Sequence, residues 1–382
     1  MSWQILDTNS IWLKEFACAL RRLTPTRNWC PEIRNFGCFE DWQKSVCLSD
    51  PNIEMIQFPL QRGYGRPPLA QVLPTGKMIS HRMLRGCTTP ELSPLMCTAP
   101  FYAPVAERWP GPVIYYLTDL TRKYAGMNEA RILALDHRMC RIARAVCPNS
   151  SRIADYLCAE AGCDRAKVTV IPNATRGQNL LPAPLLSPAA PPEDLADLPR
   201  PIVGVIGNLA SNMDWMLIAD AVNKTSHVSW AFVGPTDARI QDANEHRARE
   251  ILLGRGGRIR FLGRRKYGEL RDYARTFDVA LLPYKKHEPT YSGSATRFYE
   301  HLAACRPMLA SRGFHELLSK EPLLKLVDTG DEIVSALDYL KGQGFSDGCE
   351  ELRWRASQEG TWDVRARALM AAATQSDQAK VA

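Results

Sequence analysis

Residues 290–311 (TYSGSATRFYEHLAACRPMLAS) bring together side chains that can bind phosphate and sugar hydroxyls. Small polar residues precede an apolar helical pattern, and Arg297 and Glu300 fall within its first turns. A helix N-terminus offers free backbone N–H groups and a positive dipole end, which suits a pyrophosphate. Arg297 would add a positive charge, and Glu300 would accept hydrogen bonds from two ribose hydroxyls. The segment therefore predicts a nucleoside-diphosphate site; the alternative is an ordinary amphipathic helix with solvated charges.

Alternating strands and helices are expected to position this segment. In the second half we expect a helix at 212–224 and strands at 202–207, 228–234, 258–263, 278–283, 307–311 and 323–328. The first half repeats the theme with a helix inside 117–145 and strands at 3–6, 53–58, 93–98, 113–118, 145–150 and 168–172. This alternation predicts an α/β fold with two Rossmann-like, doubly wound parallel domains.

The length of 382 residues favours two domains, and a proline-rich stretch marks their junction. We expect an N-terminal domain at 1–180, a linker at 181–200 and a C-terminal domain at 201–348. A helical segment at 349–382, with Trp354 and Trp362 as anchors, is expected to pack back toward the N-terminal domain.

Twelve cysteines without any C-x-x-C pair are expected to be free thiols, mostly buried, in a reducing compartment. The N-terminus has no secretory pattern and no apolar run is long enough for a membrane span, so a cytoplasmic location is expected. Histidines and cysteines do not pair at zinc-ligand spacings, and we expect no metal site.

The positive charge of the chain is concentrated in its first half. Residues 1–180 carry 22 Lys and Arg against 15 Asp and Glu, whereas the remainder has 26 of each. Five of these cations, with no acid between them, lie between Glu54 and Glu91: Arg62, Arg66, Lys77, Arg82 and Arg85. The pattern predicts peripheral attraction to an anionic membrane surface, with apolar neighbours such as Met78 and Ile79 entering the interface. The alternative is a solvated loop.

Several motifs, in order, resemble those of GT-B glycosyltransferases, and of family 4 in particular. The segment RFYEHLAACRPM is similar to the nucleotide-sugar clamp K-x-x-E-Y-L-A-x-G-x-P-V of these enzymes. PIVGVIGNLASNMDWMLIADA, RFLGRRKYGELRDYARTFDVALLPYK and GTWDVRARAL resemble other family 4 segments, as do AVCPNSSRIADYL and VTVIPNAT in the first half. The resemblance implies two Rossmann-like domains facing a central cleft, a nucleotide-sugar donor and no cofactor or metal.

Carried over by position, the resemblance predicts these donor-binding residues: Asn208, Arg264, Tyr284, Tyr291, Ser292, Gly293, Ser294, Thr296, Arg297 and Glu300. The chain departs from family 4 at Ser292, where many members have a second glutamate, and it lacks their basic pair between Gly207 and Leu217. Arg297, helped by Arg264 or Lys285, would therefore carry the diphosphate charge.

The first half supplies the candidate for acceptor chemistry. YYLTDLTRKYAG resembles a stretch of the xanthan glucuronosyltransferase whose aspartate is the general base, and it places Asp119 after a buried strand. The alternative is a loop-ordering cap. Asp7, Asn9 and Trp12, on the first strand-to-helix loop, would line an acceptor groove or cap the helix. Asp136 is expected to be a solvated helical acid.

The resemblance implies a glycosyltransferase that moves a sugar to a glycan or polyprenyl-linked acceptor in bacterial surface polysaccharide or glycoconjugate synthesis. No nucleic-acid partner is expected. Two alternatives remain: a UDP-sugar 2-epimerase, and a non-catalytic module that binds sugar nucleotides.

Overall fold

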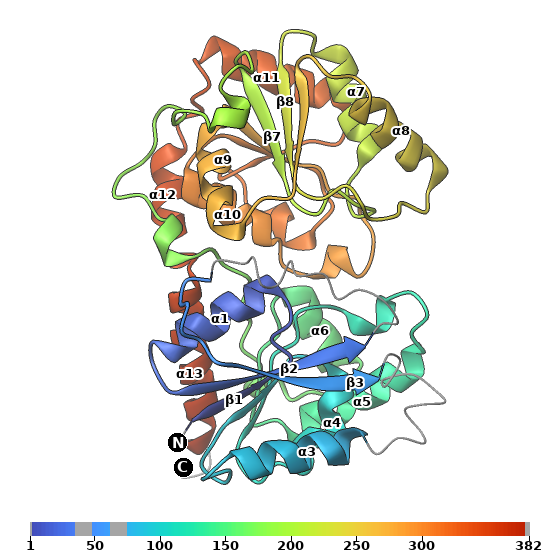
Figure 1. Ribbon diagram of the computed structural model, residues 1–382, viewed down its shortest axis with the longest axis vertical. Helices are drawn as coiled ribbons and strands as arrows, with labels where there is room; N and C mark the ends of the chain where they lie inside the picture. Colours follow the sequence, from blue (N-terminus) through green and yellow to red (C-terminus); the bar gives the residue numbers. More distant parts are fainter. Residues whose placement is uncertain (1, 35–47, 62–74, 379–382) are drawn as a thin grey trace. The chain divides into compact units, whose positions relative to one another are not determined.

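The computed structural model describes residues 2–34, 48–61 and 75–378, which form two compact units (Figure 1). Unit 1 contains the chain up to Asn173, the short segment Ser292–Ser294 and the chain from Trp362 onward. Unit 2 contains Ala174–Tyr291 and Ala295–Thr361. Each unit is built on its own parallel sheet, so the predicted α/β fold with two doubly wound sheets is confirmed.

Unit 1 has a six-stranded sheet in the order β3-β2-β1-β4-β5-β6. Its strands are β1 (Trp3–Leu6), β2 (Thr26–Arg34), β3 (Met55–Gln61), β4 (Leu95–Cys97), β5 (Val113–Tyr115) and β6 (Ala145–Val146). Its α-helices are α1 (Ile11–Arg21), α3 (Thr75–Gly86), α4 (Ala103–Ala106), α5 (Glu129–Ile142), α6 (Ser151–Ala159) and α13 (Trp362–Gln378). Every residue of β1, β4 and β5 is buried, which is expected of a parallel sheet covered on both faces.

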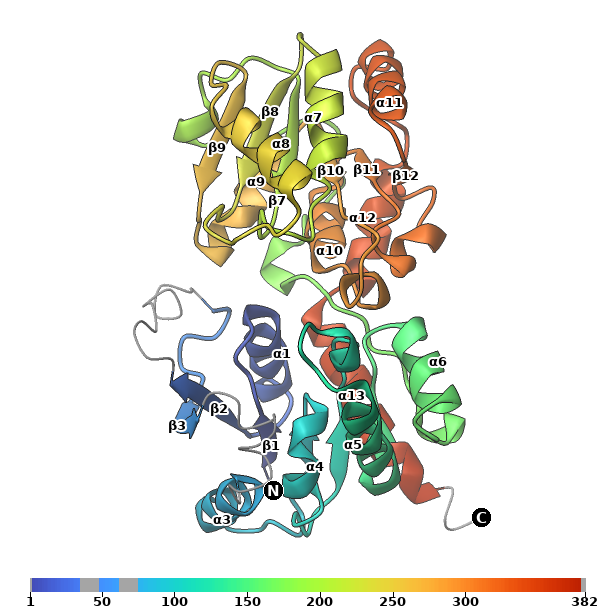
Figure 2. The same cartoon turned by 90° about the vertical axis from the view of Figure 1, so that its right-hand side faces the viewer.

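The last helix, α13, completes the core of unit 1 by packing against α1 (Figures 1 and 2). The indole of Trp362 is buried, and its ring centroid lies 5.5 Å from that of Phe16. Phe16 in turn lies 5.1 Å from Tyr116, and Arg22 forms an ion pair with Asp363 at 2.7 Å. The other predicted anchor, Trp354, lies on α12 (Glu350–Glu359) in unit 2. The predicted segment 349–382 is thus divided between the units.

Unit 2 repeats the topology with a sheet in the order β12-β11-β10-β7-β8-β9. Its strands are β7 (Ile202–Ile206), β8 (Ser229–Val233), β9 (Ile259–Gly263), β10 (Val279–Leu282), β11 (Met308–Ala310) and β12 (Lys325–Leu326). Besides α12 it has the helices α7 (Trp215–Lys224), α8 (Ala243–Leu253), α9 (Leu270–Thr276), α10 (Thr296–Ala304) and α11 (Gly330–Gly342). Helix α7 packs against α8 and α11, while α10 packs against α9 and α12 (Figure 2).

Most predicted strands are observed, with two differences in unit 1. Strand β2 was not predicted, because Pro31 and Glu32 interrupt its apolar pattern; in the structure it pairs with β1 and β3. The predicted strand at 168–172 forms only a single bridge, between Val168 and Val146, because β6 is too short to pair with more of it.

Asp136 is not the solvated acid that we expected. It is buried on α5, and its two carboxylate oxygens accept hydrogen bonds from the hydroxyls of Tyr115, at 2.5 Å, and Tyr156, at 2.6 Å. Burial raises the pKa of Asp136 to about 6, against the lowering effect of these hydrogen bonds. Asp136 therefore links β5, α5 and α6 inside the core.

The predicted basic segment lies partly outside the described residues, which exclude Arg62 and Arg66. Its described part is α3, on whose outer face Lys77, Arg82 and Arg85 are exposed. The expectation that Ile79 enters a membrane interface is wrong, because this side chain is buried in the core of unit 1. None of the helices in the described residues is both long and apolar enough to cross a bilayer.

Candidate functional site

Each sheet has a topological switch point, where crossover connections leave in opposite directions and a crevice forms at the carboxyl ends of the strands. In unit 1 this point lies between β1 and β4, and in unit 2 between β7 and β10. All four residues predicted in the first half of the chain, and three of the predicted donor-binding residues, lie at these switch points.

At the switch point of unit 1 a hollow of about 350 Å³ is lined by the loops that follow β1, β4 and β5. All four residues predicted there from sequence line it: Asp7, Asn9, Trp12 and Asp119. Although 112 residues separate the two aspartates in the chain, parallel strands end at one edge and bring their loops together. The predicted base, Asp119, and the predicted acceptor-binding residues therefore line the same pocket.

Asp7 follows β1 directly and adopts a left-handed backbone conformation, with φ of 73°. Aspartate tolerates this conformation better than most residues do. Its Oδ2 accepts a hydrogen bond from the hydroxyl of Tyr102 at 2.9 Å, and Asn9 also bonds to the carboxylate. The side-chain amide of Asn9 donates to the carbonyl of Pro31 at 2.9 Å. Burial raises the pKa of Asp7, although these hydrogen bonds oppose the shift.

Asp119 lies in the loop after β5. Its Oδ2 accepts from the hydroxyl of Thr118 at 3.2 Å, and it is hydrogen-bonded to the side chain of Tyr124. The amide of Asn149 donates to the Thr118 carbonyl at 2.6 Å and so supports the loop. Burial raises the pKa of Asp119, which brings its carboxylate closer to the basicity that proton abstraction requires. No sequence signal identified Tyr102 or Tyr124 as partners of the two acids.

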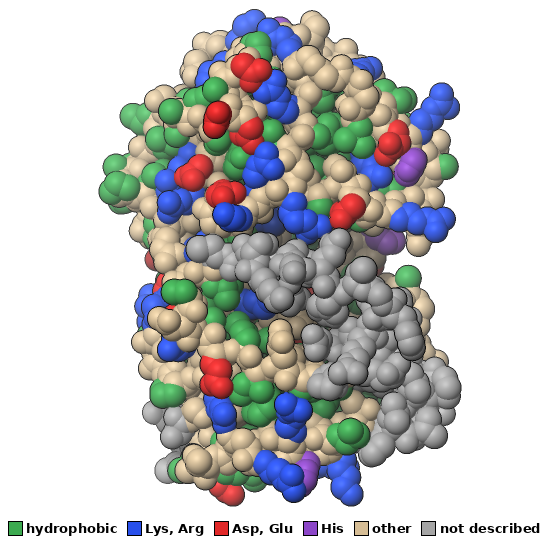
Figure 3. Space-filling view, in the orientation of Figure 1, with side chains coloured by type: hydrophobic (Ala, Val, Ile, Leu, Met, Phe, Trp, Pro, Cys, Tyr) green, Lys and Arg blue, Asp and Glu red, His purple; other side chains and the backbone are tan. Residues whose placement is uncertain are grey.

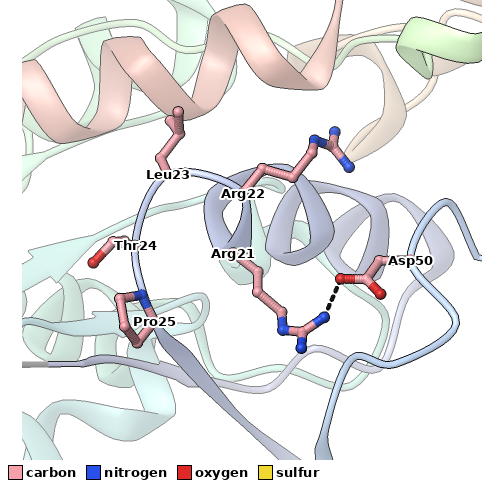
Figure 4. A pocket seen from close by; sticks show the side chains of 6 residues that line it. All are labelled: Arg21, Arg22, Leu23, Thr24, Pro25 and Asp50. Atoms are coloured by element: carbon pink, nitrogen blue, oxygen red, sulfur yellow. Dashed lines mark hydrogen bonds and ion pairs between the residues drawn. The ribbon is translucent and has the colours of Figure 1, made fainter.

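A second hollow in unit 1 lies at the end of α1 and is lined by Arg21, Arg22 and Asp50, among others (Figure 4). The guanidinium of Arg21 points toward Asp50 and pairs with it, while Arg22 pairs with Asp363. Both cations of this hollow are thus already paired with acids of unit 1.

At the switch point of unit 2, Arg297 and Glu300 form an ion pair within the first turns of α10. Gly207, which follows β7, lies beside them, since a Cβ on it would be 4.0 Å from the Nε of Arg297. Burial opposes the charge of Arg297, but Glu300 and nearby tyrosines raise its pKa. Tyr284, which follows β10, is buried and interacts electrostatically with both charges. The structure thus brings together three of the predicted donor residues, Arg297, Glu300 and Tyr284.

Glu300 is buried and uses its two oxygens unequally. Oε2 pairs with Arg297, whereas Oε1 is buried and has no hydrogen-bond partner in the described part of the chain. A buried acceptor without a donor costs about 1–3 kcal/mol, so this oxygen is well placed to accept a hydrogen bond from a ligand hydroxyl.

The N-terminus of α10 carries a carboxylate that sequence reasoning missed. Glu316 accepts from the backbone N–H of Ala295 at 2.8 Å and from the hydroxyl of Tyr299 at 2.5 Å. A bound diphosphate would therefore depend on Arg297 more than on the first N–H of the helix. Lys285, a predicted helper, is held by Glu245 at 2.8 Å, and that carboxylate also accepts from the N–H of Trp215 at the start of α7.

The remaining predicted donor residues are dispersed. Ser292, Gly293 and Ser294 belong to unit 1, where the hydroxyl of Ser150 donates to the carbonyl of Ser292, and the side-chain amide of Asn173 donates to that of Ser294 at 2.8 Å. In unit 2, Asn208 is exposed and follows β7, and Arg264 pairs with exposed Asp237 at 3.2 Å. Tyr291 stacks edge-on against His315, with ring centroids 5.9 Å apart, and half-buried Thr296 begins α10.

No family model and no curated protein matches the sequence. Its fold, however, is shared with solved structures of the GT-B glycosyltransferase class.

HepE from Anabaena, in complex with UDP and glucose, has 16% identity and a TM-score of 0.69 over 97% of this chain and 98% of that chain. Sucrose-phosphate synthase from Thermosynechococcus elongatus has 15% identity and a TM-score of 0.73 over 99% of this chain and 100% of that chain. A trehalose-phosphate synthase (UDP-forming) from Burkholderia vietnamiensis has 13% identity and a TM-score of 0.64, covering 100% and 99%. At such identities the likeness is one of fold.

Proposed function

We propose that this protein is a glycosyltransferase that moves a hexosyl-type sugar from a nucleoside diphosphate sugar to a hydroxyl of a glycan or polyprenyl-linked acceptor. The product would belong to a bacterial surface polysaccharide or glycoconjugate. The proposal is supported by the shared fold with HepE, whose structures hold UDP and UDP-glucose, and by the charged residues at the two switch points.

The observation that carries the donor assignment is the buried Oε1 of Glu300 beside Arg297, which no described residue hydrogen-bonds. A ribose hydroxyl would give this oxygen its missing donor. The guanidinium of Arg297, whose charge is shared with Glu300 in the free protein, would stabilise the diphosphate. Of the predicted donor set, Arg297, Glu300 and Tyr284 are therefore the residues on which we rest the site.

For the chemical step we assign the general base to Asp119. Its carboxylate takes the proton of the acceptor hydroxyl as the acceptor oxygen forms a bond to the anomeric carbon of the donor. The bond from that carbon to the diphosphate oxygen breaks, and its electron pair leaves with the nucleoside diphosphate. Such a displacement inverts the anomeric centre, as the resemblance to the xanthan glucuronosyltransferase implies, whereas membership of family 4 would imply retention.

The described part of α3 supports a peripheral association of unit 1 with anionic membranes. Lys and Arg side chains gather with a histidine over this helix at the lower edge of Figure 3. Lys77, His81 and Arg85 follow one another at helical spacing on the exposed face, and Met78 beside them is 65% exposed. This arrangement suits an interfacial helix of a protein that works at the cytoplasmic face of a membrane.

The test begins with the full chain, a panel of UDP- and GDP-sugars, and release of nucleoside diphosphate with and without a lipid or glycan extract. We expect release that depends on the extract, together with UDP binding by calorimetry that weakens roughly a hundredfold in Glu300→Ala. Glu351→Ala, an exposed acid paired with Arg355 on α12, is the matched control and should bind as the wild type does.

Other outcomes would identify another function. Interconversion of the sugar nucleotide without transfer would make the protein an epimerase. UDP binding without turnover of any donor would make it a binding module. Unchanged UDP affinity in Glu300→Ala would remove the donor site from α10.

A further inference from the structure

The hollow at the switch point of unit 1 has a distinct electrostatic character. Its described lining contains two carboxyl groups, from Asp7 and Asp119, and neither lysine nor arginine. Each acid is hydrogen-bonded to a tyrosine, Tyr102 or Tyr124, and to no cation in the described residues. An anion that entered would thus meet two uncompensated carboxyl groups.

The rest of the lining offers apolar surface and unused polar atoms. Trp12 and Phe101 contribute aromatic rings to the wall. The Oγ of Ser10 and the Nε1 of Trp12, both on lining residues, are buried and have no hydrogen-bond partner among the residues that the structure describes. Apolar walls with a few polar groups that fix orientation are typical of sites for small polar ligands. A sugar ring presents both apolar C–H faces and hydroxyl groups, and so fits this lining.

We propose that this pocket admits only an uncharged sugar ring and excludes phosphorylated sugars, and that Asp7 is the residue that imposes this specificity. The inference rests on the proposed function and narrows it: the part of the acceptor that reacts is neutral. Asp7 accepts hydrogen bonds from acceptor hydroxyls while its charge repels phosphate. If the acceptor is carried on a lipid pyrophosphate, that pyrophosphate lies outside this pocket.

The strength of the discrimination can be estimated from Coulomb's law for an assumed separation. Two unit charges about 6 Å apart near a protein surface, with an effective dielectric constant of about 20, repel by an energy equivalent to roughly a hundredfold in affinity. Asp7→Asn is a clean way to remove this charge, because asparagine also tolerates the left-handed backbone at this position.

The experiment measures binding to full-length protein saturated with UDP, using calorimetry or ligand-observed NMR. The probes are the methyl glycosides of glucose, galactose and mannose and the 6-phosphates of the same three sugars. In the wild type we expect at least one neutral glycoside to bind, and to bind at least tenfold more tightly than its phosphorylated counterpart. Asp7→Asn should weaken that glycoside roughly tenfold and lower the ratio of the two affinities at least threefold, with the remaining discrimination due to Asp119.

The control is Asp155→Asn, which removes a similar charge from an exposed position on α6 of unit 1 and should leave both affinities unchanged. Once a donor sugar nucleotide that supports turnover is known, Asp7→Asn should raise KM for the neutral acceptor more than it lowers kcat. Misfolding of the variant would instead lower kcat and leave KM unchanged. Failure of all three neutral glycosides to bind, or equal or tighter binding of a 6-phosphate, would overturn the inference. UDP binding in the same samples separates this failure from failure of the proposed function, which would show as no nucleotide bound.

Discussion

Unit 1 and unit 2 place different chemistry at the same point of the same topology. At the switch point of unit 1, Asp7 and Asp119 are held by tyrosines and have raised pKa values. At that of unit 2, Arg297 and Glu300 pair with each other. The strand order is common to both, so the difference arises entirely from the loops and helix ends. We infer that the first site handles protons and hydroxyls and the second handles a diphosphate.

The largest effect should come from removing the base of unit 1. Asp119→Asn keeps the shape and hydrogen bonding of the side chain but cannot accept a proton. A general base contributes roughly 10²- to 10⁴-fold, so turnover should fall within that range while UDP affinity is unchanged. The measurement is steady-state release of nucleoside diphosphate, with Asp155→Asn as control. A retained rate would make Asp119 a structural residue and favour a retaining reaction in which the donor phosphate assists.

A smaller effect is expected on the free energy of unfolding. It distinguishes Asp136, in the core of unit 1, from Asp7 and Asp119, which line the pocket. The pKa of Asp136 is about 6 in the folded protein against 3.8 as its ordinary value, so the folded state binds this proton more tightly. The contribution of Asp136 to stability should therefore be fully present below about pH 4 and fall by about 3 kcal/mol as pH rises to above 6. Urea unfolding of the wild type and Asp136→Asn near these two limits tests this.

In Asp136→Asn the dependence of stability on pH in this range should shrink to the part contributed by other groups, among them Asp7, Asp119 and Asp214, whose pKa values are also raised. Asp155→Asn, outside the core, should retain the slope of the wild type. An identical slope in all three proteins would show that Asp136 does not titrate in this range.

A smaller effect still is expected at the membrane. Replacing Lys77, Arg82 and Arg85 of α3 with glutamate should abolish co-sedimentation with vesicles that contain anionic lipid, because each cation contributes about 1 kcal/mol. The same replacement of three exposed cations of unit 2, Arg255, Lys325 and Lys341, should leave binding unchanged. Binding by the wild type should weaken as salt rises. Equal loss in both triple variants would indicate an effect of net charge alone.

Removal of divalent metal ions should have no effect on turnover. Because Arg297 is proposed to stabilise the leaving diphosphate, release of nucleoside diphosphate should persist in EDTA. Loss of activity in EDTA that is restored by Mg²⁺ or Mn²⁺ would show that a metal ion shares this task.

The pattern of apolar residues was sufficient to predict the strands that are buried on both faces. Strands such as β7 and β10 are uninterrupted apolar runs, and their order follows from alternation with helices. It failed for β2, where Pro31 breaks the pattern but the strand is retained by pairing on both sides.

The site was predictable in parts. Asp119 and Asp7 were identified by type and by position after a strand, and Glu300 by its place on a helix. The burial of Asp136 could not be predicted, because the two tyrosines that donate hydrogen bonds to it come from β5 and α6, and these elements are brought together only by packing. The same holds for Glu316, whose hydrogen bond to Ala295 joins segments 21 residues apart.

The course of the chain has a consequence for dissection of the protein. Apart from Ser292–Ser294, which belong to unit 1, unit 2 runs from Ala174 to Thr361, and its two ends lie side by side, since the N–H of Thr175 donates to the carbonyl of Gly360 at 2.9 Å. Unit 2 is thus an insert with adjacent ends, and we expect a fragment of residues 174–361 to fold by itself. Truncation after residue 173, by contrast, removes α13, which covers Phe16 and Tyr116, so we expect unit 1 to fold only when residues 1–173 are joined to α13 by a short linker.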